Sequence, residues 1–181
     1  FMALMGMEST ELTIADVGTG SGAIAINLAI HLPSAKIYAV DVEDAVLDVA
    51  AYNVRVHGVA DRVNLAIGDL LDSVPEPVDL IVANLPYIPT DRIPTLQLEV
   101  QQEPVLALDG GPDGLNLVRR LLNQAEDKLK DHGIILLEMD PEQIPVVQEL
   151  VLQHFPEGST SVEQDLAGMD RILVIHRQAV E

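Results

Sequence analysis

The stretch LTIADVGTGSGAIAINLA, residues 12–29, indicates the fold of the whole chain. Leu12 to Val17 has the composition of a β-strand, and the glycines that follow are typical of a tight turn. Ala23 to Leu32 then has helical composition, and Pro33 ends the predicted helix. A strand that runs through a glycine-rich turn into a helix is the beginning of a βαβ unit.

The rest of the chain repeats this alternation of strand and helix. Further strands are predicted at residues 35–41, 61–69, 78–84 and 133–139, and helices at residues 45–57, 115–130 and 141–154. The last two strands, at residues 159–165 and 171–177, have no helix between them and are expected to pair antiparallel. The runs LIVA and IILL are continuously apolar, as in strands covered on both faces. We therefore predict an α/β fold with a doubly wound, mostly parallel seven-stranded sheet and an antiparallel C-terminal edge.

One long segment, residues 85–116, is rich in Pro, Gly and Asp. It is predicted to be a loop with little regular structure, and loops of this length in compact domains are usually functional or disordered. Within it, LALDGGPDG (residues 106–114) is either a structural turn or a flap over a ligand. The preceding Glu103-Pro104 either braces the loop or touches the substrate.

Composition limits the function. The chain of 181 residues is long enough for one well-packed domain, and a content of 48% apolar residues without Trp predicts an aliphatic core. The formal charge of −19 argues against broad DNA or RNA binding, because phosphate binding needs a basic face. A small molecule or a protein is the expected substrate.

The absence of cysteine excludes a disulfide framework, a thiolate nucleophile and a Cys-ligated zinc site. It is compatible with a reducing cytoplasm, which is the expected location. The five histidines, at positions 31, 57, 132, 154 and 176, have no spacing that resembles a zinc site, and most are expected at surface helix ends or edge strands. No metal is therefore expected.

The opening FMALMGM, residues 1–7, is apolar but too short to span a bilayer. It also lacks the basic flank and the cleavage pattern of a signal peptide. We interpret it as the last turns of a helix. Because the chain starts at Phe1 and not at an initiator Met, further sequence upstream is expected.

The glycine loop, residues 18–22, comprises Gly18, Thr19, Gly20, Ser21 and Gly22. Its glycines permit a tight turn and a close approach of a ligand to the backbone, while the following helix offers free N–H groups. The spacing is G-x-G-x-G, whereas dinucleotide-binding dehydrogenases favour G-x-G-x-x-G. The other interpretation is a strand-to-helix turn without a ligand.

Acidic residues end the predicted second and third strands. Asp41 is placed to accept hydrogen bonds from both hydroxyls of a ribose, although it could instead be a helix N-cap, a role for which Asp44 competes. Asp69 is placed to accept from the exocyclic amine of an adenine, with Leu70 and Leu71 available to cover the ring. The alternative for Asp69 is a solvated turn aspartate.

Asp16, just before the glycine loop, either orients a cationic amine, directly or through water, or is exposed without a role. In open α/β sheets, ligands bind at the carboxyl ends of the strands. Four strands thus bring Asp16 with the glycines, Asp41, Asp69 and Asn84 to one edge. The joint pattern predicts a pocket for S-adenosyl-L-methionine.

Asn84, Leu85, Pro86 and Tyr87 form the predicted acceptor motif, which follows the apolar run VDLIVA. A nitrogen in an amide or an exocyclic NH2 group is a poor nucleophile because its lone pair is delocalised. The side-chain oxygen of Asn84 and the backbone carbonyl of Leu85 can each accept one N–H, while Tyr87 packs against the planar acceptor. Catalysis would then be mostly positioning for in-line methyl transfer. The other interpretation is a turn after a buried strand.

Over residues 14–177 the chain resembles the HemK/PrmC family, the N5-glutamine methyltransferases that act on the GGQ loop of peptide chain release factors. The motifs that carry the resemblance are DVGTGSGAIAINLA, AVD, GDLL, NLPYIP, EPVLALDGGPDGL, LLEM and DLAGMDRILV. The segment LALDGGPDGL after the acceptor motif, together with the late DLAGMDR, distinguishes this family from other methyltransferases.

The resemblance implies a Rossmann-like class I methyltransferase domain over residues 12–181 that uses S-adenosyl-L-methionine and releases S-adenosyl-L-homocysteine. Residues 1–11 would be the tail of an N-terminal helical domain or a linker. The implied site comprises Gly18, Thr19, Gly20, Ser21 and Gly22 in the cofactor loop, Asp41 at the ribose, Asp69 and Leu70 at the adenine, and Asn84, Leu85, Pro86 and Tyr87 at the glutamine amide. A release factor is the implied protein partner.

One position departs from the family, which usually has Asn-Pro-Pro-Tyr where this chain has Leu85. Leucine still presents the backbone carbonyl, but it frees φ and adds an N–H that proline lacks. Asn-Leu-Pro-Tyr also resembles the motif of ribosomal RNA adenine dimethyltransferases. Two alternatives therefore stand beside the glutamine methyltransferase: an N6-adenine methyltransferase acting on RNA or DNA, and a non-catalytic nucleotide-binding domain.

Overall fold

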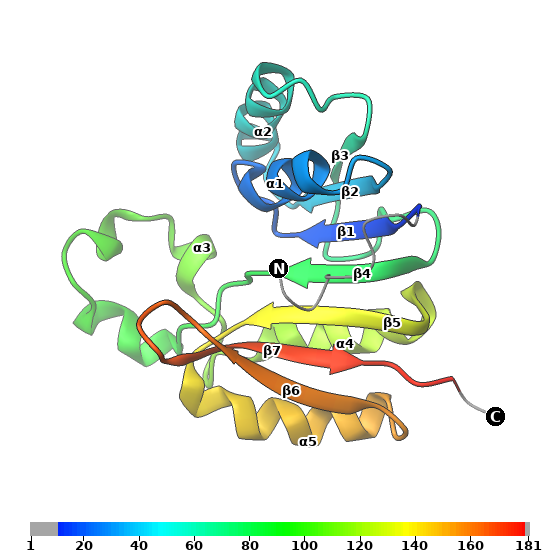
Figure 1. Ribbon diagram of the computed structural model, residues 1–181. Helices are drawn as coiled ribbons and strands as arrows, with labels where there is room; N and C mark the ends of the chain where they lie inside the picture. The colour runs from blue at the N-terminus through cyan, green and yellow to red at the C-terminus, as the bar shows by residue number, and fades with distance from the viewer. Residues whose placement is uncertain (1–10, 180–181) are drawn as a thin grey trace.

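A seven-stranded sheet forms the centre of the molecule, with the spatial order β3-β2-β1-β4-β5-β7-β6 (Figure 1). The computed structural model describes residues 11–179. The strands are β1 Thr13–Val17, β2 Lys36–Asp41, β3 Val63–Ile67, β4 Val78–Ala83, β5 Leu129–Glu138, β6 Ser159–Gln164 and β7 Asp170–His176. The first five are parallel, and β7 runs antiparallel to both β5 and β6. The predicted fold, including its antiparallel C-terminal edge, is confirmed.

The helices connect the strands as expected for a doubly wound sheet. They are α1 Ala23–His31, α2 Asp44–Val56, α3 Val105–Leu108, α4 Asn116–Lys128 and α5 Ile144–His154, with short 3₁₀ helices η2 Thr90–Thr95, η3 Val100–Gln102 and η4 Pro141–Gln143. In the part of the chain that the structure describes, no helix combines the length and the apolar character needed to cross a membrane.

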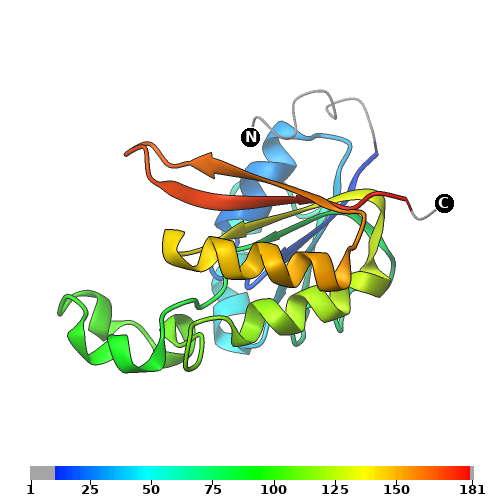
Figure 2. The ribbon, with the colours of Figure 1, turned by 90° about the horizontal axis from the view of Figure 1, so that it is seen from below.

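Each face of the sheet has its own apolar core, because successive side chains of a strand point to opposite faces. Ile14 of β1 packs in a cluster with Ile26 of α1 and Val54 of α2. Ala15, the next residue of β1, belongs to a second cluster that contains side chains of α4 and α5, such as Val147. Figure 2 shows α4 and α5 side by side on one face of the sheet. Burial on both faces explains why the central strands are continuously apolar.

The structure corrects the predicted boundaries at two strands. The third strand ends at Ile67 and not at Asp69, because the chain turns at Leu70, which has a positive φ of 59°. The fifth strand begins at Leu129, where we expected the preceding helix to continue. Its first residues are irregular, with a register shift against β4 and a φ of 62° at His132. A bulged strand start has no simple apolar periodicity to reveal it.

The segment after β4 has more regular structure than predicted. It contains η2, η3 and α3, whose turns are held by local backbone hydrogen bonds such as that from the Arg92 N–H to the Pro89 carbonyl, at 2.9 Å. Short 3₁₀ turns of this kind serve as connectors. Residues 89–108, which we call the projecting segment, extend away from the sheet beyond the carboxyl ends of β1 and β4 (Figure 1).

The prediction of a helix at residues 1–7 lies outside the described residues, and so does most of the predicted tail or linker at residues 1–11. The division of the chain at residue 12 stays a prediction.

Candidate functional site

A cavity of about 430 Å³ lies at the carboxyl ends of the strands, a size typical of small-molecule sites. Its walls come from the glycine loop, from the turns after β2, β3 and β4, from the projecting segment and from α4. The lining residues are Val17, Gly18, Gly20, Val40, Asp41, Val42, Glu43, Val46, Gly68, Asp69, Leu70, Asn84, Leu85, Pro86, Pro104, Leu106, Ala107, Leu117 and Arg120. The cavity therefore joins residues that are far apart in the sequence.

The glycine loop is tied to the end of β2 by backbone contacts. The N–H groups of Gly18 and Thr19 donate to the Val40 carbonyl at 2.9 and 3.0 Å. Gly18 has a φ of 71°, and a Cβ at this position would lie 3.2 Å from Cδ2 of Leu85. A glycine is needed here both for this conformation and for the close packing of the loop on the acceptor motif.

Asp16 is buried, with only 1% of its surface exposed, so the alternative of an exposed residue without a role is wrong. Its Oδ2 accepts hydrogen bonds from Oγ1 of Thr19 at 2.7 Å and from the N–H of Ala25 at 3.0 Å. Its Oδ1 is buried without a hydrogen-bond partner among the described residues. Burial raises the pKa of the Asp16 carboxyl to about 6. Asp16 and Thr19 thus hold the glycine loop to the start of α1.

Asp41 connects the glycine loop with the start of α2. Its Oδ2 accepts from the N–H of Gly20 at 3.0 Å, and its Oδ1 accepts from the N–H of Glu43 at 3.2 Å. Glu43 occupies the N-cap position of α2, so neither Asp41 nor Asp44 is the N-cap. Asp41 lines the cavity, where each of its carboxylate oxygens already accepts a backbone N–H.

The turn after β3 forms a further wall of the cavity. Leu70 adopts a left-handed conformation that is rare for leucine, and only 5% of its surface is exposed. The N–H of Leu71 donates to Oε1 of Gln124 at 2.7 Å. Asp69 is half exposed and forms an ion pair with Arg120. Asp69 is therefore not a freely solvated turn residue, and its Oδ2 is already paired with Arg120.

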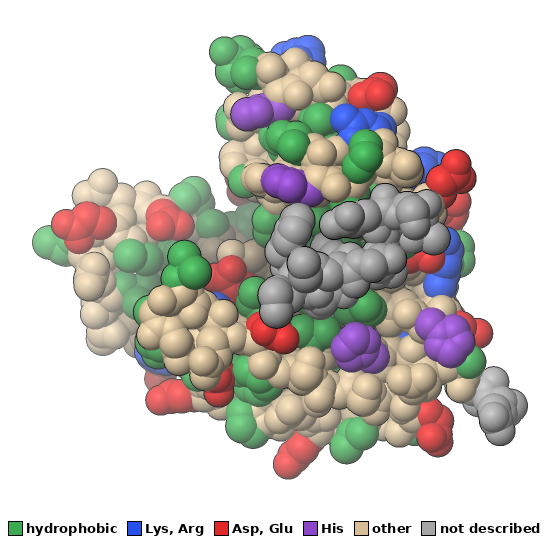
Figure 3. All heavy atoms as spheres, in the orientation of Figure 1, with side chains coloured by type: hydrophobic (Ala, Val, Ile, Leu, Met, Phe, Trp, Pro, Cys, Tyr) green, Lys and Arg blue, Asp and Glu red, His purple; other side chains and the backbone are tan. Residues whose placement is uncertain are grey.

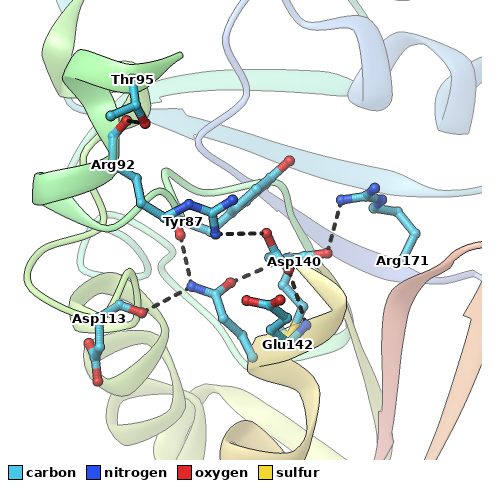
Figure 4. Close-up of polar contacts among 9 residues, drawn as sticks. Tyr87, Arg92, Thr95, Asp113, Asp140, Glu142 and Arg171 are labelled. Carbon is cyan, nitrogen blue, oxygen red and sulfur yellow. Dashed lines mark hydrogen bonds and ion pairs between the residues drawn. The ribbon is translucent and has the colours of Figure 1, made fainter.

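The acceptor motif enters the cavity through three of its four residues. Asn84 is exposed, Leu85 is buried, and both line the cavity together with Pro86. Tyr87 is half-buried beyond the lining, and burial raises the pKa of its phenol, with the nearby charge of Glu138 acting in the same direction. Near Tyr87, Asp140 forms an ion pair with Arg92 at 3.4 Å (Figure 4).

The predicted site residues fall into two groups. Within the described residues, those that line the cavity are Gly18, Gly20, Asp41, Asp69, Leu70, Asn84, Leu85 and Pro86, and those that do not are Asp16, Thr19, Ser21, Gly22 and Tyr87. The members of the second group make internal contacts instead, such as the hydrogen bond from Nδ2 of Asn53 to the Ser21 carbonyl at 2.9 Å and that from the Gly22 N–H to the Thr19 carbonyl at 2.9 Å. A binding role for any of these residues stays a prediction.

Sequence reasoning missed the wall that α4 contributes. Leu117 and Arg120 line the cavity, and Gln124 holds the turn after β3. Their spacing of three and four residues places them on one face of α4, beside the buried stripe that includes Leu121 and Ala125. This spacing is a signal in the sequence, but it points to a site only when the neighbouring turn is known. Sequence reasoning also missed three cavity-lining residues that follow Asp41, namely Val42, Glu43 and Val46.

The projecting segment covers the cavity from one side. Pro104, Leu106 and Ala107 line it. Of the two alternatives for residues 106–114, a flap over a ligand and a structural turn, each describes one part of the segment. The first part faces the cavity, while the Asp109 side chain makes a turn by accepting from the Gly111 N–H at 2.8 Å. Figure 3 shows hydrophobic and acidic side chains on this segment and a hollow between it and the upper part of the molecule. Leu98 is among the exposed apolar residues there.

Among residues 11–179 there is no group of three or more His, Asp or Glu side chains placed to hold a metal ion. His31 and His154 are at helix ends, and His57 is the C-cap of α2. His176 lies in β7, which has a neighbour on each side, so it is not in an edge strand.

Comparison with known proteins identifies similar sequences. Residues 2–107 match the family model described as ribosomal protein L11 methyltransferase (PrmA). Release factor glutamine methyltransferases from several bacteria are 38% to 46% identical to the chain. That of Moorella thermoacetica is 46% identical over 167 residues, which make up 92% of this chain and 59% of that protein.

Two further comparisons concern a different acceptor and the fold. The ribosomal protein uL3 glutamine methyltransferase of Bradyrhizobium diazoefficiens is 42% identical over 145 residues, covering 80% of this chain and 44% of that protein. The crystal structure of ribosomal protein L11 methylase from Lactobacillus delbrueckii subsp. bulgaricus has a TM-score of 0.68 and 23% identity, covering 98% and 78% of the two chains. This structural likeness shows the Rossmann-like methyltransferase fold.

Proposed function

Since the chain belongs to the PrmA-type methyltransferase family and its relatives confirm the resemblance to the HemK/PrmC glutamine methyltransferases, we propose that it methylates the side-chain amide nitrogen of a protein glutamine. The chain spans about 59% of the length of the Moorella relative. The proposal therefore concerns the activity of the protein to which these residues belong. One observation supports it most: Asn84 and Leu85 line the same cavity as the glycine loop, Asp41 and Asp69.

The residues of the cavity fit S-adenosyl-L-methionine. The loop at Gly18 and Gly20 exposes backbone to the cavity, Asp41 offers carboxylate oxygens to ribose hydroxyls, and Leu70 gives apolar cover for a nucleobase. The orphaned Oδ1 of Asp16 fits a cationic amine, reached through water because Asp16 itself does not line the cavity. When bound, the cofactor supplies an electrophilic methyl group on a sulfonium.

The acceptor motif supplies the positioning in this proposal. Oδ1 of Asn84 and the backbone carbonyl of Leu85 each accept one N–H of the glutamine amide and fix its nitrogen toward the methyl donor. These hydrogen bonds strengthen as the nitrogen gains positive charge in the transition state, so they lower the barrier to transfer. Tyr87 packs against the planar amide. Transfer would form the nitrogen–carbon bond and break the sulfur–carbon bond, with S-adenosyl-L-homocysteine as the leaving group and one amide proton released to solvent. No nucleophilic side chain takes part.

A protein acceptor agrees better with the charge of this chain than a nucleic acid does. With a formal charge of −19, the chain repels phosphates, and it needs no basic surface to bind a glutamine-containing loop. The relatives name two acceptor proteins, release factors and ribosomal protein uL3. We propose a release factor and its GGQ glutamine, because that name is shared by relatives from several bacteria, and we place the reaction in the cytoplasm, where translation takes place.

Two experiments on the full-length protein test this function. Calorimetry with S-adenosyl-L-methionine and with NAD separates a methyltransferase from another nucleotide-binding domain, and we expect binding of the first ligand only. Incubation with methyl-labelled cofactor then compares a release factor, ribosomal protein uL3, and adenine-containing RNA and DNA. Label on the release factor is the expected result. Label on nucleic acid alone would contradict the proposal and favour an N6-adenine methyltransferase.

A further inference from the structure

The backbone of the acceptor motif is held from outside by the side chain of Gln143. Nε2 of Gln143 donates to the Tyr87 carbonyl at 2.8 Å and to the Asp113 carbonyl at 3.1 Å. Dashed lines at the labelled Tyr87 and Asp113 mark these two hydrogen bonds in Figure 4. Gln143 ends η4, which lies between β5 and α5 and is separated from Tyr87 by 56 residues in the sequence. One amide group thus joins the acceptor motif, the loop before α4 and the start of α5.

The Gln143 amide is buried and fully engaged. Only 8% of the residue is exposed, and its Oε1 accepts from the Asp140 N–H at 3.2 Å, in a capping box at the N-terminus of η4. Glutamate serves this capping function as well as glutamine does, because only the acceptor oxygen is needed. The two donated hydrogen bonds are different, since an ionised glutamate has no N–H or O–H to donate. The two donated hydrogen bonds, and not the capping hydrogen bond, therefore require glutamine rather than glutamate at this position.

The chain packs so closely around this contact that a side chain at Gly114 has no room. Gly114 has a φ of 76°, and a Cβ there would lie 2.1 Å from the Tyr87 carbonyl oxygen and 2.3 Å from Nε2 of Gln143. The adjoining backbone is also paired: the Ile88 N–H donates to the Leu108 carbonyl at 3.0 Å, and the Gly110 N–H donates to the Ile88 carbonyl at 2.9 Å. The chain just after the acceptor motif therefore has one well-defined path.

From this geometry we infer that Gln143 is a positioning residue, which fixes the acceptor motif for methyl transfer without touching substrate or cofactor. The inference rests on the proposed function. The motif has Leu85 where the HemK/PrmC family usually has proline, so the φ angle at this position is not restricted by a ring. The hydrogen bond from the Gln143 side chain to the Tyr87 carbonyl restricts the backbone two residues later. Misplacement by about 1 Å can lower turnover by about 100-fold, so a small relaxation is enough to matter.

Two variants of the full-length protein separate positioning from capping. Gln143→Glu keeps the capping oxygen and replaces the donors by a carboxylate, while Gln143→Leu removes both. At pH 8 we expect kcat to fall by about 10-fold to 100-fold in both variants, with KM for the acceptor protein and the Kd of S-adenosyl-L-methionine within about twofold of the native values. Lowering the pH to 6 favours protonation of the glutamate, because burial raises the pKa of a carboxyl, and the protonated form regains one donor. At pH 6 we therefore expect the kcat of Gln143→Glu to lie closer to the native kcat than at pH 8. The ratio of the Gln143→Leu kcat to the native kcat stays the same.

Hydrogen exchange provides a second measurement that does not depend on the acceptor. We expect the N–H groups of Ile88, Thr90 and Gly110 to exchange faster in Gln143→Leu than in the native protein at the same pH, since their hydrogen bonds adjoin the released carbonyl. Unchanged exchange at these three groups would refute the inference, whatever the acceptor is. Native turnover in both variants, or a loss of turnover that follows a loss of cofactor affinity, would also refute it. A native protein that transfers no methyl group to glutamine would refute the proposed function instead, and the exchange data would still decide the role of Gln143.

Discussion

Asn84 is the side chain on which methyl transfer depends most directly in the proposed function. It is exposed at the end of β4 and lines the cavity, so its amide can meet an acceptor without any change in the sheet. We expect Asn84→Ala to bind S-adenosyl-L-methionine within about twofold of the native affinity and to lose about 100-fold or more in kcat, as found when a single hydrogen-bonding group is removed at a developing charge. Calorimetry and single-turnover transfer measure the two effects. Asn123→Ala, on the exposed face of α4, is the matched control, and native turnover by Asn84→Ala would contradict the assigned role.

Asp16 predicts a dependence of stability on pH. Its folded pKa of about 6 lies above the ordinary value of 3.8, so between these two values the folded protein binds more protons than the unfolded chain. Its contribution to the free energy of unfolding is therefore full below about pH 4 and lost as the pH rises through 6, an effect on the order of 3 kcal/mol. Asparagine does not ionise and avoids this loss.

We accordingly expect the difference in the free energy of unfolding between Asp16→Asn and the native protein to shift in favour of the variant by about 2 kcal/mol between pH 4.5 and pH 7.5, because pH 4.5 already lies above the unfolded pKa of 3.8. Urea denaturation at both values measures it. Asp48→Asn, on the exposed surface of α2, makes the same chemical change away from the core. A difference for Asp16→Asn that does not change with pH would show that its carboxyl is not perturbed as described.

The sequence predicted the position of Asp16 but not its surroundings. Its place before the glycine loop follows from residue spacing, whereas its burial depends on α1, whose Ala25 N–H donates to it. The role of Gln143 was not predicted either, because it also depends on a contact with a distant segment. Gln143 looks like an ordinary capping residue beside Pro141, and its contact with Tyr87 spans 56 residues. Contacts between distant segments have no local pattern in the sequence.

At the scale of elements, α4 combines a buried face with a face that lines the cavity. One face carries buried residues such as Leu121, and the neighbouring face holds the turn after β3 through Arg120 and Gln124. We expect Arg120→Ala to weaken binding of S-adenosyl-L-methionine by about twofold to fivefold, because the ion pair that orients Asp69 is exposed and ion pairs of this kind contribute about 1 kcal/mol or less. Calorimetry measures the loss of affinity.

Arg119→Ala is the control for this change. Arg119 is the next residue of α4, is paired with Asp113 at 2.6 Å, and does not line the cavity within the described part of the chain. Equal losses of affinity in the two variants would mean that α4 as a whole, and not the contact between Arg120 and Asp69, supports the binding of the cofactor.

Element identities were predictable because the central strands are continuously apolar and because Pro33, Gly58 and Pro156 lie just after α1, α2 and α5. The boundaries of the elements were less predictable. Each difference between a predicted and an observed boundary has a local cause. β3 stops early because the chain turns through Leu70, and β5 starts early through a bulge near His132. The short helices of the projecting segment consist of one or two turns, which are too brief to show a helical period.

At the scale of the whole molecule, the order of the sheet brings the carboxyl ends of β1, β2 and β4 together. The alternation of strands and helices predicted the doubly wound, mostly parallel sheet and the edge at which the cavity lies. It did not predict the outer walls of the cavity. Those come from Leu106 in the projecting segment and Leu117 in α4, whose approach to the sheet is decided by packing and not by a motif.

The most direct test of the account asks which atom of which protein receives the methyl group. The full-length protein, a release factor and S-adenosyl-L-methionine are incubated together, and the GGQ-containing peptide is analysed by fragmentation mass spectrometry, with Asn84→Ala as the inactive control. The account predicts the mass of one added methyl group on the glutamine of that peptide, present with the native protein and absent with the variant. An unmodified glutamine under conditions in which the methyl group is transferred elsewhere would contradict it.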